Sequence, residues 1–271
     1  MPEGPEIHRA TDVLSEALSG KTLSRVWFAF PGLKRHESCL LGRKVLTVQA
    51  RGKAILTHFD NGWTLYSHNQ LYGQWRVLAT GEEAKTTRSL RVALETDQHR
   101  ALLFSASDVE LIRDDDLDLQ PYLARLGPDA VDPTTTLDDI RAQLVNPRFS
   151  GRSLAALLLD QGFVAGMGNY LRAEVLFEAG IAAQHRPRDL DDNARERLAN
   201  ALLAIPRHSY RTRGIERIGA GMRDDLQYDD GERFRFKVFG RDGKPCERCG
   251  TAIVRSEAGG RRLYACPTCQ S

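Results

Sequence analysis

The chain has 271 residues, of which 41% are hydrophobic and 27% are charged, and its formal net charge is +2. At ~150 residues per domain, this length suggests about two domains with room for real hydrophobic cores. Because no apolar run approaches the ~20 residues of a membrane span, and no signal peptide precedes the first predicted helix, we expect a cytoplasmic protein with no membrane partner.

The first predicted element is a helix over residues 5–18, which follows an N-terminus of chemical interest. Apolar residues recur on one face of this helix, Pro5 suits its first turn, and Gly20 suits its end. Removal of the initiator methionine would leave Pro2 as a secondary amine, which is nucleophilic near neutral pH, and Glu3 can move protons around it. The alternative is a processed terminus without a catalytic role.

Residues 22 to about 112 have the pattern of a β-domain. Strands are predicted over residues 44–50, 54–59 and 63–68, and the alternation continues around residues 90–94 and 102–104. Asn61-Gly62 is a strong hairpin signal between two of these strands. Because there is no βαβ alternation, we expect an antiparallel sandwich or a flattened barrel.

Two turns in this region carry candidate functional residues. In Arg51-Gly52-Lys53, the glycine permits a close backbone approach and Lys53 can contact a phosphate, although an ordinary surface turn is the commoner explanation. Residues 69–73 place Gln70, Leu71 and Tyr72 side by side. Amide and apolar side chains of this kind can fill the gap left by an extruded base, but apolar strand residues are more often part of a core.

Beyond an aspartate-rich stretch at residues 108–118, interpreted as a solvated boundary, the pattern becomes helical. Thr136 can cap a helix over residues 137–144, and an apolar run suggests a buried helix within residues 153–161. A further amphipathic helix is predicted over residues 189–205. Residues 206–232 have little periodicity and are predicted to form a long loop.

A glycine-rich segment, residues 162–170, lies between two of these helices and precedes a helix at residues 171–179. Asn169 stands where that helix would be capped. The turn amides, the helix N-terminus and the Asn169 amide also suit a phosphate clamp. Both interpretations, a simple N-cap and a phosphate site, are open from the sequence.

The C-terminal segment has paired cysteines and a strong positive charge. Sixteen residues separate the two Cys-x-x-Cys pairs, and residues 233–271 contain nine Lys/Arg and three Asp/Glu, a net +6 on a body of −4. A two-stranded ribbon is expected, with Arg261 and Arg262 after a Gly-Gly turn. We expect one structural zinc ion rather than a redox pair, held by Cys246, Cys249, Cys266 and Cys269. The remaining cysteine, Cys39, is interpreted as a reduced bystander.

These motifs together resemble one family. Met-Pro-Glu-Gly-Pro-Glu-Ile, the Arg-Gly-Lys turn, Gly-Met-Gly-Asn-Tyr and a C-terminal four-cysteine finger occur in this order in bacterial formamidopyrimidine-DNA glycosylase/endonuclease VIII proteins. The resemblance covers essentially the whole chain. It implies a multidomain α+β fold: an N-terminal helix and antiparallel β-sandwich in residues 1–125, a helix–two-turn–helix domain and loop in 126–232, and a zinc finger in 233–271.

The resemblance also implies an activity, a bifunctional DNA glycosylase and abasic-site lyase of base excision repair that cleaves by β,δ-elimination. Pro2 resembles the Schiff-base nucleophile, Glu3 its general acid partner and Lys53 the residue that assists β-elimination. Arg261 matches the finger arginine of δ-elimination, with Arg262 beside it as an alternative. The expected DNA contacts are Gln70, Leu71, Tyr72, Arg125 and Asn169.

The expected partner is double-stranded DNA with oxidised bases or abasic sites, bound by a monomer that is cytoplasmic and nucleoid-associated. Gly4 and the segments at residues 26–31 and 65–73 are similar to the endonuclease VIII branch, which implies oxidised pyrimidines such as thymine glycol. Two alternatives are weighed: the same chemistry on oxidised purines (8-oxoguanine, formamidopyrimidine), and a non-catalytic zinc-ribbon DNA-binding protein.

Overall fold

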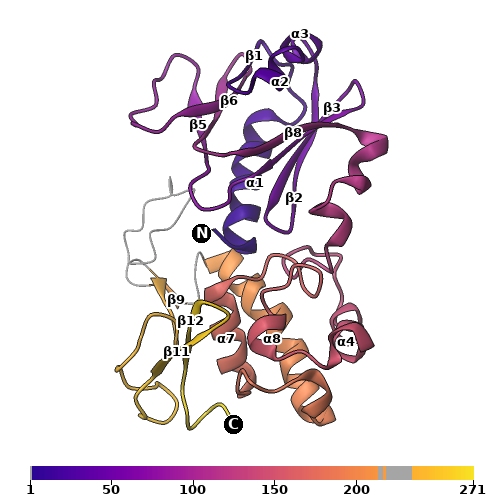
Figure 1. The fold of residues 1–271 in the computed structure, drawn as a ribbon. Helices are drawn as coiled ribbons and strands as arrows, with labels where there is room; N and C mark the ends of the chain where they lie inside the picture. The colour runs from indigo at the N-terminus through magenta and orange to yellow at the C-terminus, as the bar shows by residue number, and fades with distance from the viewer. Residues whose placement is uncertain (1, 213–215, 218–233) are drawn as a thin grey trace. The chain divides into compact units, whose positions relative to one another are not determined.

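The computed structural model describes residues 2–212, 216–217 and 234–271, which form two compact units (Figure 1). The first unit holds residues 2 and 6–124. The second holds residues 3–5, 125–212, 216–217 and 234–271. Of the loop predicted over residues 206–232, residues 213–215 and 218–232 lie outside the described residues.

The first unit is built on two four-stranded sheets within residues 25–113, all of which are described. Every neighbouring pair of strands is antiparallel, so the predicted sandwich is confirmed. The strands predicted at 44–50, 54–59 and 63–68 agree with the observed ones to within one residue. One sheet has the order β1 (Arg25–Phe28), β6 (Leu90–Glu95), β7 (His99–Phe104), β5 (Gln74–Ala79), and the other β2 (Val45–Arg51), β3 (Ala54–Phe59), β4 (Trp63–His68), β8 (Asp108–Arg113).

The core of this unit takes side chains from both sheets and from one face of α1 (Gly4–Leu18). Ile7 and Leu14 of the helix are fully buried with Phe28 of one sheet, as the apolar spacing predicted. Complete burial of one such side chain contributes about 1.5–3 kcal/mol. The indole N–H of Trp75 donates to Ser67 Oγ at 3.1 Å, which ties β5 of one sheet to β4 of the other.

The acidic stretch at residues 108–118 is not a simple solvated boundary, and that interpretation is wrong for its first half. Residues Asp108–Arg113 form β8, which pairs with β4, because Val109 and Leu111 alternate towards the core. The following η1 (Asp114–Leu119) is a 3-10 helix, and η2 (Leu123–Arg125) follows it. Two further short helices, α2 (Pro31–Lys34) and α3 (Glu37–Leu40), connect β1 to β2.

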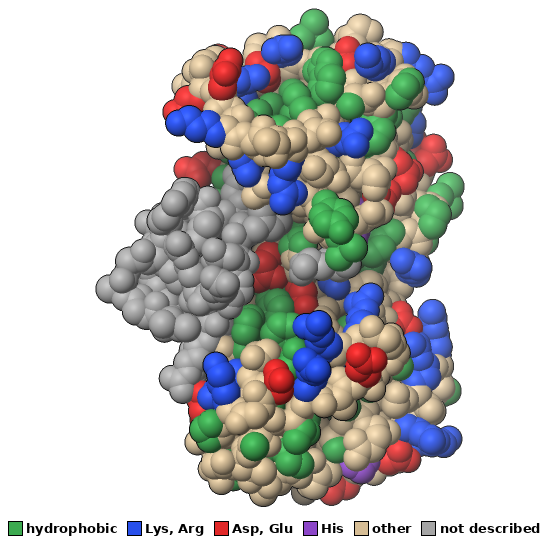
Figure 2. All heavy atoms as spheres, turned by 60° about the vertical axis from the view of Figure 1, so that its left-hand side comes forward, with side chains coloured by type: hydrophobic (Ala, Val, Ile, Leu, Met, Phe, Trp, Pro, Cys, Tyr) green, Lys and Arg blue, Asp and Glu red, His purple; other side chains and the backbone are tan. Residues whose placement is uncertain are grey.

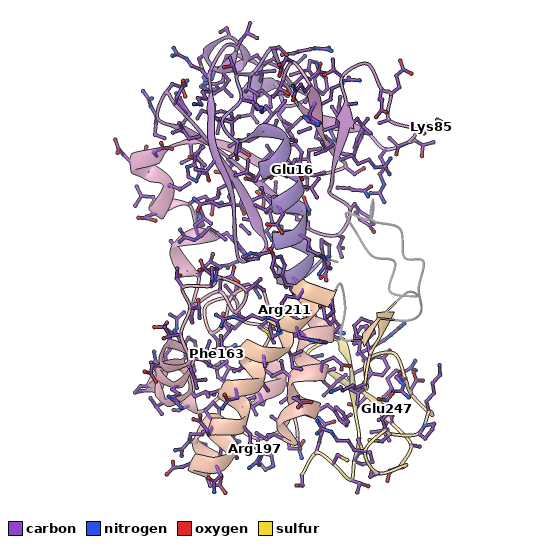
Figure 3. All side chains as sticks on the ribbon, turned by 180° about the vertical axis from the view of Figure 1, so that it is seen from behind. Glu16, Lys85, Phe163, Arg197, Arg211 and Glu247 are labelled. Atoms are coloured by element: carbon purple, nitrogen blue, oxygen red, sulfur yellow. The ribbon has the colours of Figure 1, made fainter. Side chains whose placement is uncertain are left out.

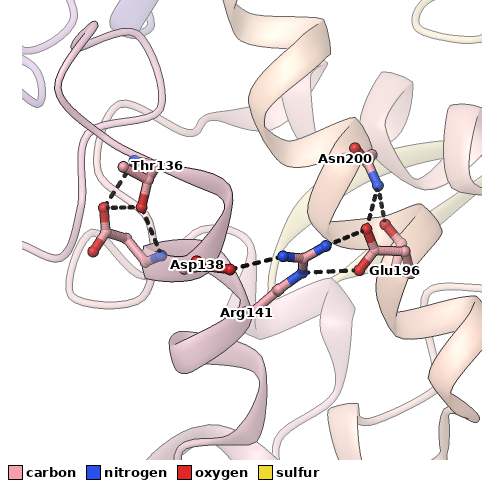
Figure 4. Close-up of polar contacts among 6 residues, drawn as sticks. Thr136, Asp138, Arg141, Glu196 and Asn200 are labelled. Atoms are coloured by element: carbon pink, nitrogen blue, oxygen red, sulfur yellow. Dashed lines mark hydrogen bonds and ion pairs between the residues drawn. The ribbon is translucent and has the colours of Figure 1, made fainter.

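The helical part of the second unit packs α7 (Asn169–Ala179) and α4 (Leu137–Val145) against α8 (Asp192–Thr212). Thr136 caps α4 in a complete capping box, as predicted. Figure 4 shows Arg141 of α4 donating to Glu196 of α8 at 2.7 and 2.9 Å, and also to Asp138. Figure 3 labels Arg197 of α8, which donates to the carbonyl of Ala179 at the end of α7.

Two helix predictions need correction. The apolar run within residues 153–161 is largely buried, but only α6 (Leu154–Leu157) is helical, because the amides of Leu159 and Asp160 donate to carbonyls three residues back, in turns, rather than four residues back. The helix predicted to end at Ile205 continues through Pro206 to Thr212. Pro206 and Ser209 are buried, so the packed face extends past the proline. The remaining short helices are α5 (Pro147–Ser150) and η3 (Pro187–Asp189).

The C-terminal segment forms the predicted ribbon. β11 (Val254–Ala258) and β12 (Arg261–Ala265) pair across Gly259 and Gly260, both at positive φ, which suits a two-residue hairpin turn. Before this ribbon in the chain, β9 (Glu216–Arg217) pairs with β10 (Phe234–Arg235). No helix among the described residues is both long and apolar enough to span a bilayer.

Candidate functional site

Glu3 is a buried carboxylate that caps helix α7. Its Oε1 accepts the N–H of Tyr170 at 2.9 Å and its Oε2 accepts the N–H of Leu171 at 3.2 Å. The N-cap residue of α7 is Gly168, which has no side chain to satisfy these amides. Glu3 is only 4% exposed, so these two amides provide the hydrogen bonds that a buried carboxyl group needs. The position of this carboxylate is therefore fixed by the start of α7.

Three glycines make room for this arrangement. The N–H of Gly4 donates to the carbonyl of Gly166 at 2.8 Å, and a Cβ on Gly4 would lie 3.0 Å from the Gly166 Cα. Gly166 also has φ +84°, which glycine adopts without strain. A Cβ on Gly168 would lie 2.1 Å from the Glu3 Cδ. The glycines thus permit the backbone around Glu3 to approach the turn before α7.

Asn169 is the first residue of α7 rather than its N-cap, so the capping interpretation is wrong. Its side-chain Nδ2 donates to the carbonyl of Arg262 at 2.9 Å, and its Oδ1 accepts from Arg172 at 2.7 Å. The predicted phosphate clamp included the amides at the start of this helix. Two of them, from Tyr170 and Leu171, are instead bonded to Glu3. Asn169 therefore joins the helix to the finger ribbon.

Arg172 lies at the centre of this junction and is fully buried. Its guanidinium donates to the carbonyls of Ala155 at 2.8 Å and Arg262 at 3.1 Å, besides Asn169. Burial lowers its pKa, nearby Arg261 lowers it further, and Glu3 acts in the opposite direction. Arg172 is thus electrostatically coupled to both Glu3 and Arg261. Arg172 was not among the residues predicted for the site, although its spacing of three residues from Asn169 puts both on one helix face.

The ribbon distinguishes the two adjacent arginines, both of which are exposed. Arg261 shares a strand face with Leu263, which packs into the helical core, whereas Arg262 lies on the opposite face, across from Glu257. Arg261 is also the one whose charge acts on Arg172. Arg261 therefore lies on the ribbon face that packs towards the helical core, near enough for its charge to act on Arg172.

The four finger cysteines converge as predicted. Their sulfur atoms all lie within 4.8 Å of one another. The hydroxyl and amide of Thr251 lower the pKa of Cys249 to about 6, whereas hydrogen bonding to the Cys249 sulfur raises that of Cys269 to about 12. Four thiols crowded in this way suit a cation that stabilises the thiolates together, and a tetrahedral zinc ion matches the donor set. The chain carries one structural zinc ion.

A second buried carboxylate attaches the finger to α7. Glu174 is 1% exposed and accepts the N–H groups of Lys237, Val238 and Phe239 at 2.9–3.0 Å. Burial raises its pKa, and these three bonds act against that shift. The contact fixes the segment that leads into the cysteines, and no local pattern in the sequence indicates it.

In the first unit, Lys53 lies in the two-residue turn between β2 and β3. Gly52 has φ +63°, and both residues are buried, so the alternative of an ordinary surface turn is wrong. Lys53 is 7% exposed, and its backbone N–H donates to the Tyr122 hydroxyl at 2.8 Å. The turn therefore buries a lysine, and burying an isolated charge would cost free energy.

The turn after β4 presents two apolar side chains to solvent. Leu71 is 59% exposed and Tyr72 is 69% exposed, so the alternative that they belong to the sandwich core is wrong. The N–H of Gly73 closes the turn on the Asn69 carbonyl at 2.7 Å. A Cβ on Gly73 would lie 2.6 Å from that oxygen, which explains the glycine. Large exposed apolar side chains on a tight turn indicate a contact surface.

The predicted residues therefore fall into two groups. Glu3, Asn169 and Arg261 meet around Arg172 in the second unit, and Lys53 and the turn at residues 70–72 belong to the first. Pro2 is half-buried directly before Glu3, and Arg125 is exposed at the end of η2. Figure 2 shows Lys and Arg side chains exposed on each unit, as suits a polyanionic ligand.

Family models match three stretches of the chain. They are the formamidopyrimidine-DNA glycosylase N-terminal domain at residues 1–107, the formamidopyrimidine-DNA glycosylase H2TH domain at 126–218, and the zinc finger found in FPG and IleRS at 243–271. Two similar proteins are endonuclease 8 of Shigella sonnei strain Ss046 and of Escherichia coli strain K12 / DH10B. They are 53% and 52% identical over 270 residues, with 100% of each chain covered.

Solved structures share the fold. The complex of wild-type Lactococcus lactis Fpg with N7-benzyl-Fapy-dG containing DNA matches with a TM-score of 0.81 at 22% identity, covering 100% of both chains. The Lactococcus lactis formamidopyrimidine-DNA glycosylase non-covalently bound to DNA with an abasic site matches with a TM-score of 0.80 at 20% identity, covering 99% of both.

Proposed function

The chain belongs to the formamidopyrimidine-DNA glycosylase/endonuclease VIII family, and from this premise we propose that it excises oxidised pyrimidines from DNA through an imine formed on Pro2. The chain is a DNA glycosylase and abasic-site lyase of base excision repair, and DNA is its partner. This sets aside the alternative of a non-catalytic zinc-ribbon protein. We further propose that it acts as a cytoplasmic, nucleoid-associated monomer with no membrane partner.

The reaction begins at the amine of Pro2, exposed by removal of the initiator methionine. The damaged nucleotide is flipped out of the stack so that its C1′ can be reached. The nitrogen of Pro2 forms a bond to C1′ as the C1′–base bond breaks, and opening of the sugar ring leaves an iminium. That cation acts as an electron sink, so C2′ loses a proton and the 3′ phosphate departs. A second elimination then releases the 5′ phosphate.

The observation that carries this proposal is the fixed Glu3 carboxylate beside Pro2. Its two bonds from the α7 amides hold it in place, and it follows the nucleophile directly in the chain. Its carboxyl group, held in a set position, can donate a proton to the sugar oxygen as the ring opens, and the carboxylate that remains can accept a proton afterwards. Because the start of α7 already holds Glu3 in place, this group needs little reorganisation during the reaction.

The phosphates need cations and amide donors. Lys53, in its buried turn, assists the first elimination, and Asn169 and Arg261 bind backbone phosphates beside Glu3. Between the two finger arginines, Arg261 is the better candidate for the second elimination, because it lies on the ribbon face that packs towards the helical core and is coupled to Arg172. Arg262 lies on the opposite strand face, in register with Glu257. Zinc folds the finger when bound and takes no part in the bond changes.

The exposed turn at residues 70–72 suits the gap that flipping leaves. Leu71 and Tyr72 have the apolar surface to stack in the duplex, and Gln70 has an amide to pair with the orphaned base. Arg125 is proposed as a further DNA contact. A turn that joins an amide, an aliphatic and an aromatic side chain in succession supports the pyrimidine branch, with oxidised purines as the alternative.

Excision from matched duplexes tests the substrate proposal. Single-turnover rates are measured on oligonucleotides of one sequence carrying either thymine glycol or 8-oxoguanine at the same position. We expect faster release of thymine glycol. A pronounced preference for 8-oxoguanine would assign the enzyme to the purine branch and leave the Pro2 chemistry intact.

A further inference from the structure

The exposed apolar turn is held in a conformation that its sequence does not favour. Gln70 has φ +49°, in the left-handed region that residues with a Cβ seldom adopt. Such a conformation persists where the surroundings determine it, and it is common where a side chain must be aimed. The contacts of Gln70 with its neighbours therefore decide whether Leu71 and Tyr72 are presented rigidly.

His68, the last residue of β4, provides the acceptor for this strained residue. Its Nδ1 accepts the N–H of Gln70 at 3.0 Å, which requires the neutral ring with its proton on Nε2. Ser107 Oγ donates to the Gln70 Oε1 at 3.0 Å, and Arg88 donates to the Tyr72 carbonyl at 2.6 Å. The His68 contact holds the backbone of the strained residue, whereas the Ser107 contact holds its side chain.

The same imidazole packs against the support of the Lys53 turn. The rings of His68 and Tyr122 meet edge to face, with centroids 5.1 Å apart and planes at 73°. The hydroxyl of Tyr122 accepts the N–H of Lys53 at 2.8 Å. In the sheet, His68 is paired with Ala54, the residue after Lys53. One side chain thus contacts both the apolar turn and the tyrosine that holds the lysine turn.

Tyr122 is itself held in place by Gln120. The Gln120 Oε1 accepts the N–H of Tyr122 at 2.7 Å, and its Nε2 donates to Glu110 of β8 at 3.1 Å. Tyr66, which is fully buried, also packs against Tyr122, with ring centroids 6.4 Å apart. The ring on which His68 packs is therefore anchored to the sheet.

From these contacts we propose that His68 is a positioning residue for the wedge, the turn formed by Gln70, Leu71 and Tyr72, and that it acts through the acceptor at Nδ1. The proposal rests on the function given above, in which the wedge fills the gap that the flipped base leaves in the duplex. Because the ring holds the wedge through Nδ1, the turn is already in its final conformation when the base is flipped, and binding does not have to order it.

Two variants of His68 separate the acceptor from the ring. His68→Phe keeps an aromatic ring against Tyr122 but removes the acceptor, whereas His68→Asn places an amide oxygen close to the position of Nδ1 and removes the ring. Single-turnover release of thymine glycol is compared on a duplex and on the same lesion strand alone, which has no gap for a wedge to fill. Because both rates come from one protein sample, their ratio does not depend on the folded fraction.

We expect His68→Phe to lower the duplex-to-single-strand ratio about fivefold, as the loss of one backbone hydrogen bond suggests, and His68→Asn to keep it within about twofold. An unchanged ratio in His68→Phe, or equal losses in both variants, would overturn the proposal. Nitrogen-15 spectra of the wild-type imidazole test it without any variant, since a proton on Nδ1 would exclude the bond to Gln70. A wild-type enzyme inactive on both substrates would instead count against the proposed function.

Discussion

Replacing Gly168 by alanine tests the positioning of Glu3 without touching a chemical group. The new Cβ would lie 2.1 Å from the Glu3 Cδ, and ordinary contact begins at 3.4 Å, so the carboxylate must withdraw by about 1.3 Å. That withdrawal breaks its bonds to the amides of Tyr170 and Leu171, now 2.9 and 3.2 Å long. The N-terminus of α7 would then lose its cap.

The magnitude follows from the two lost bonds and the displaced group. Leaving a buried N–H without a partner costs about 1–3 kcal/mol, so the helical unit should lose about 2–6 kcal/mol of stability. A catalytic group displaced by ~1 Å can cost about a hundredfold in rate. We therefore expect Gly168→Ala to lower single-turnover excision by about that factor and to lower the melting temperature.

Excision of thymine glycol from a duplex and thermal melting by circular dichroism provide the assay. Gly32→Ala is the matched control, because a Cβ at Gly32 of α2 meets nothing within 4 Å and its φ is not positive. This control should keep the wild-type rate. A folded Gly168→Ala enzyme that also excises at the wild-type rate would refute the role given to the Glu3 contact.

Three further outcomes are expected. Chelation of zinc, or Cys246→Ser, should unfold the finger, because metal binding is part of the folding of a structural zinc site. DNA binding, measured by fluorescence anisotropy, should then weaken at least tenfold, and full affinity would contradict this. Arg261→Ala should stop cleavage at the β-elimination product on sequencing gels, whereas Arg262→Ala should still give both products, and the reverse pattern would exchange their roles. Burial lowers the pKa of His58 despite Asp114, so the folded state binds fewer protons than the unfolded state below pH 6.5. Urea unfolding should therefore show stability falling as the pH drops from 6.5 through the lowered pKa, and His58→Gln should flatten that decline.

Local patterns predicted most of the sandwich and the finger. Alternation located β2 to β4, and the cysteine spacing located the zinc ligands, because both signals lie within a few residues of the chain. The strand Asp108–Arg113 was obscured by Asp108 and Glu110, which alternate with Val109, a residue of the core. The extension of α8 past Pro206 was hidden because a proline alone usually ends a helix.

The candidate site was predictable as a set of residues but not as an arrangement. Nothing near Glu3 in the sequence indicates that it caps a helix starting at Asn169, because the contact joins segments over 160 residues apart. The exposure of Leu71 and the burial of Lys53 likewise depend on tertiary packing. Composition alone favoured the opposite outcome for both residues.

The central claim is that the amine of Pro2 forms the covalent link to the sugar. Wild-type enzyme is incubated with abasic-site DNA and borohydride, digested with trypsin, and the linked peptide is located by tandem mass spectrometry. We expect a reduced adduct on the nitrogen of Pro2 in a chain that lacks Met1. An adduct on Lys53, or a trapped protein that still begins with methionine, would show that Pro2 is not the nucleophile.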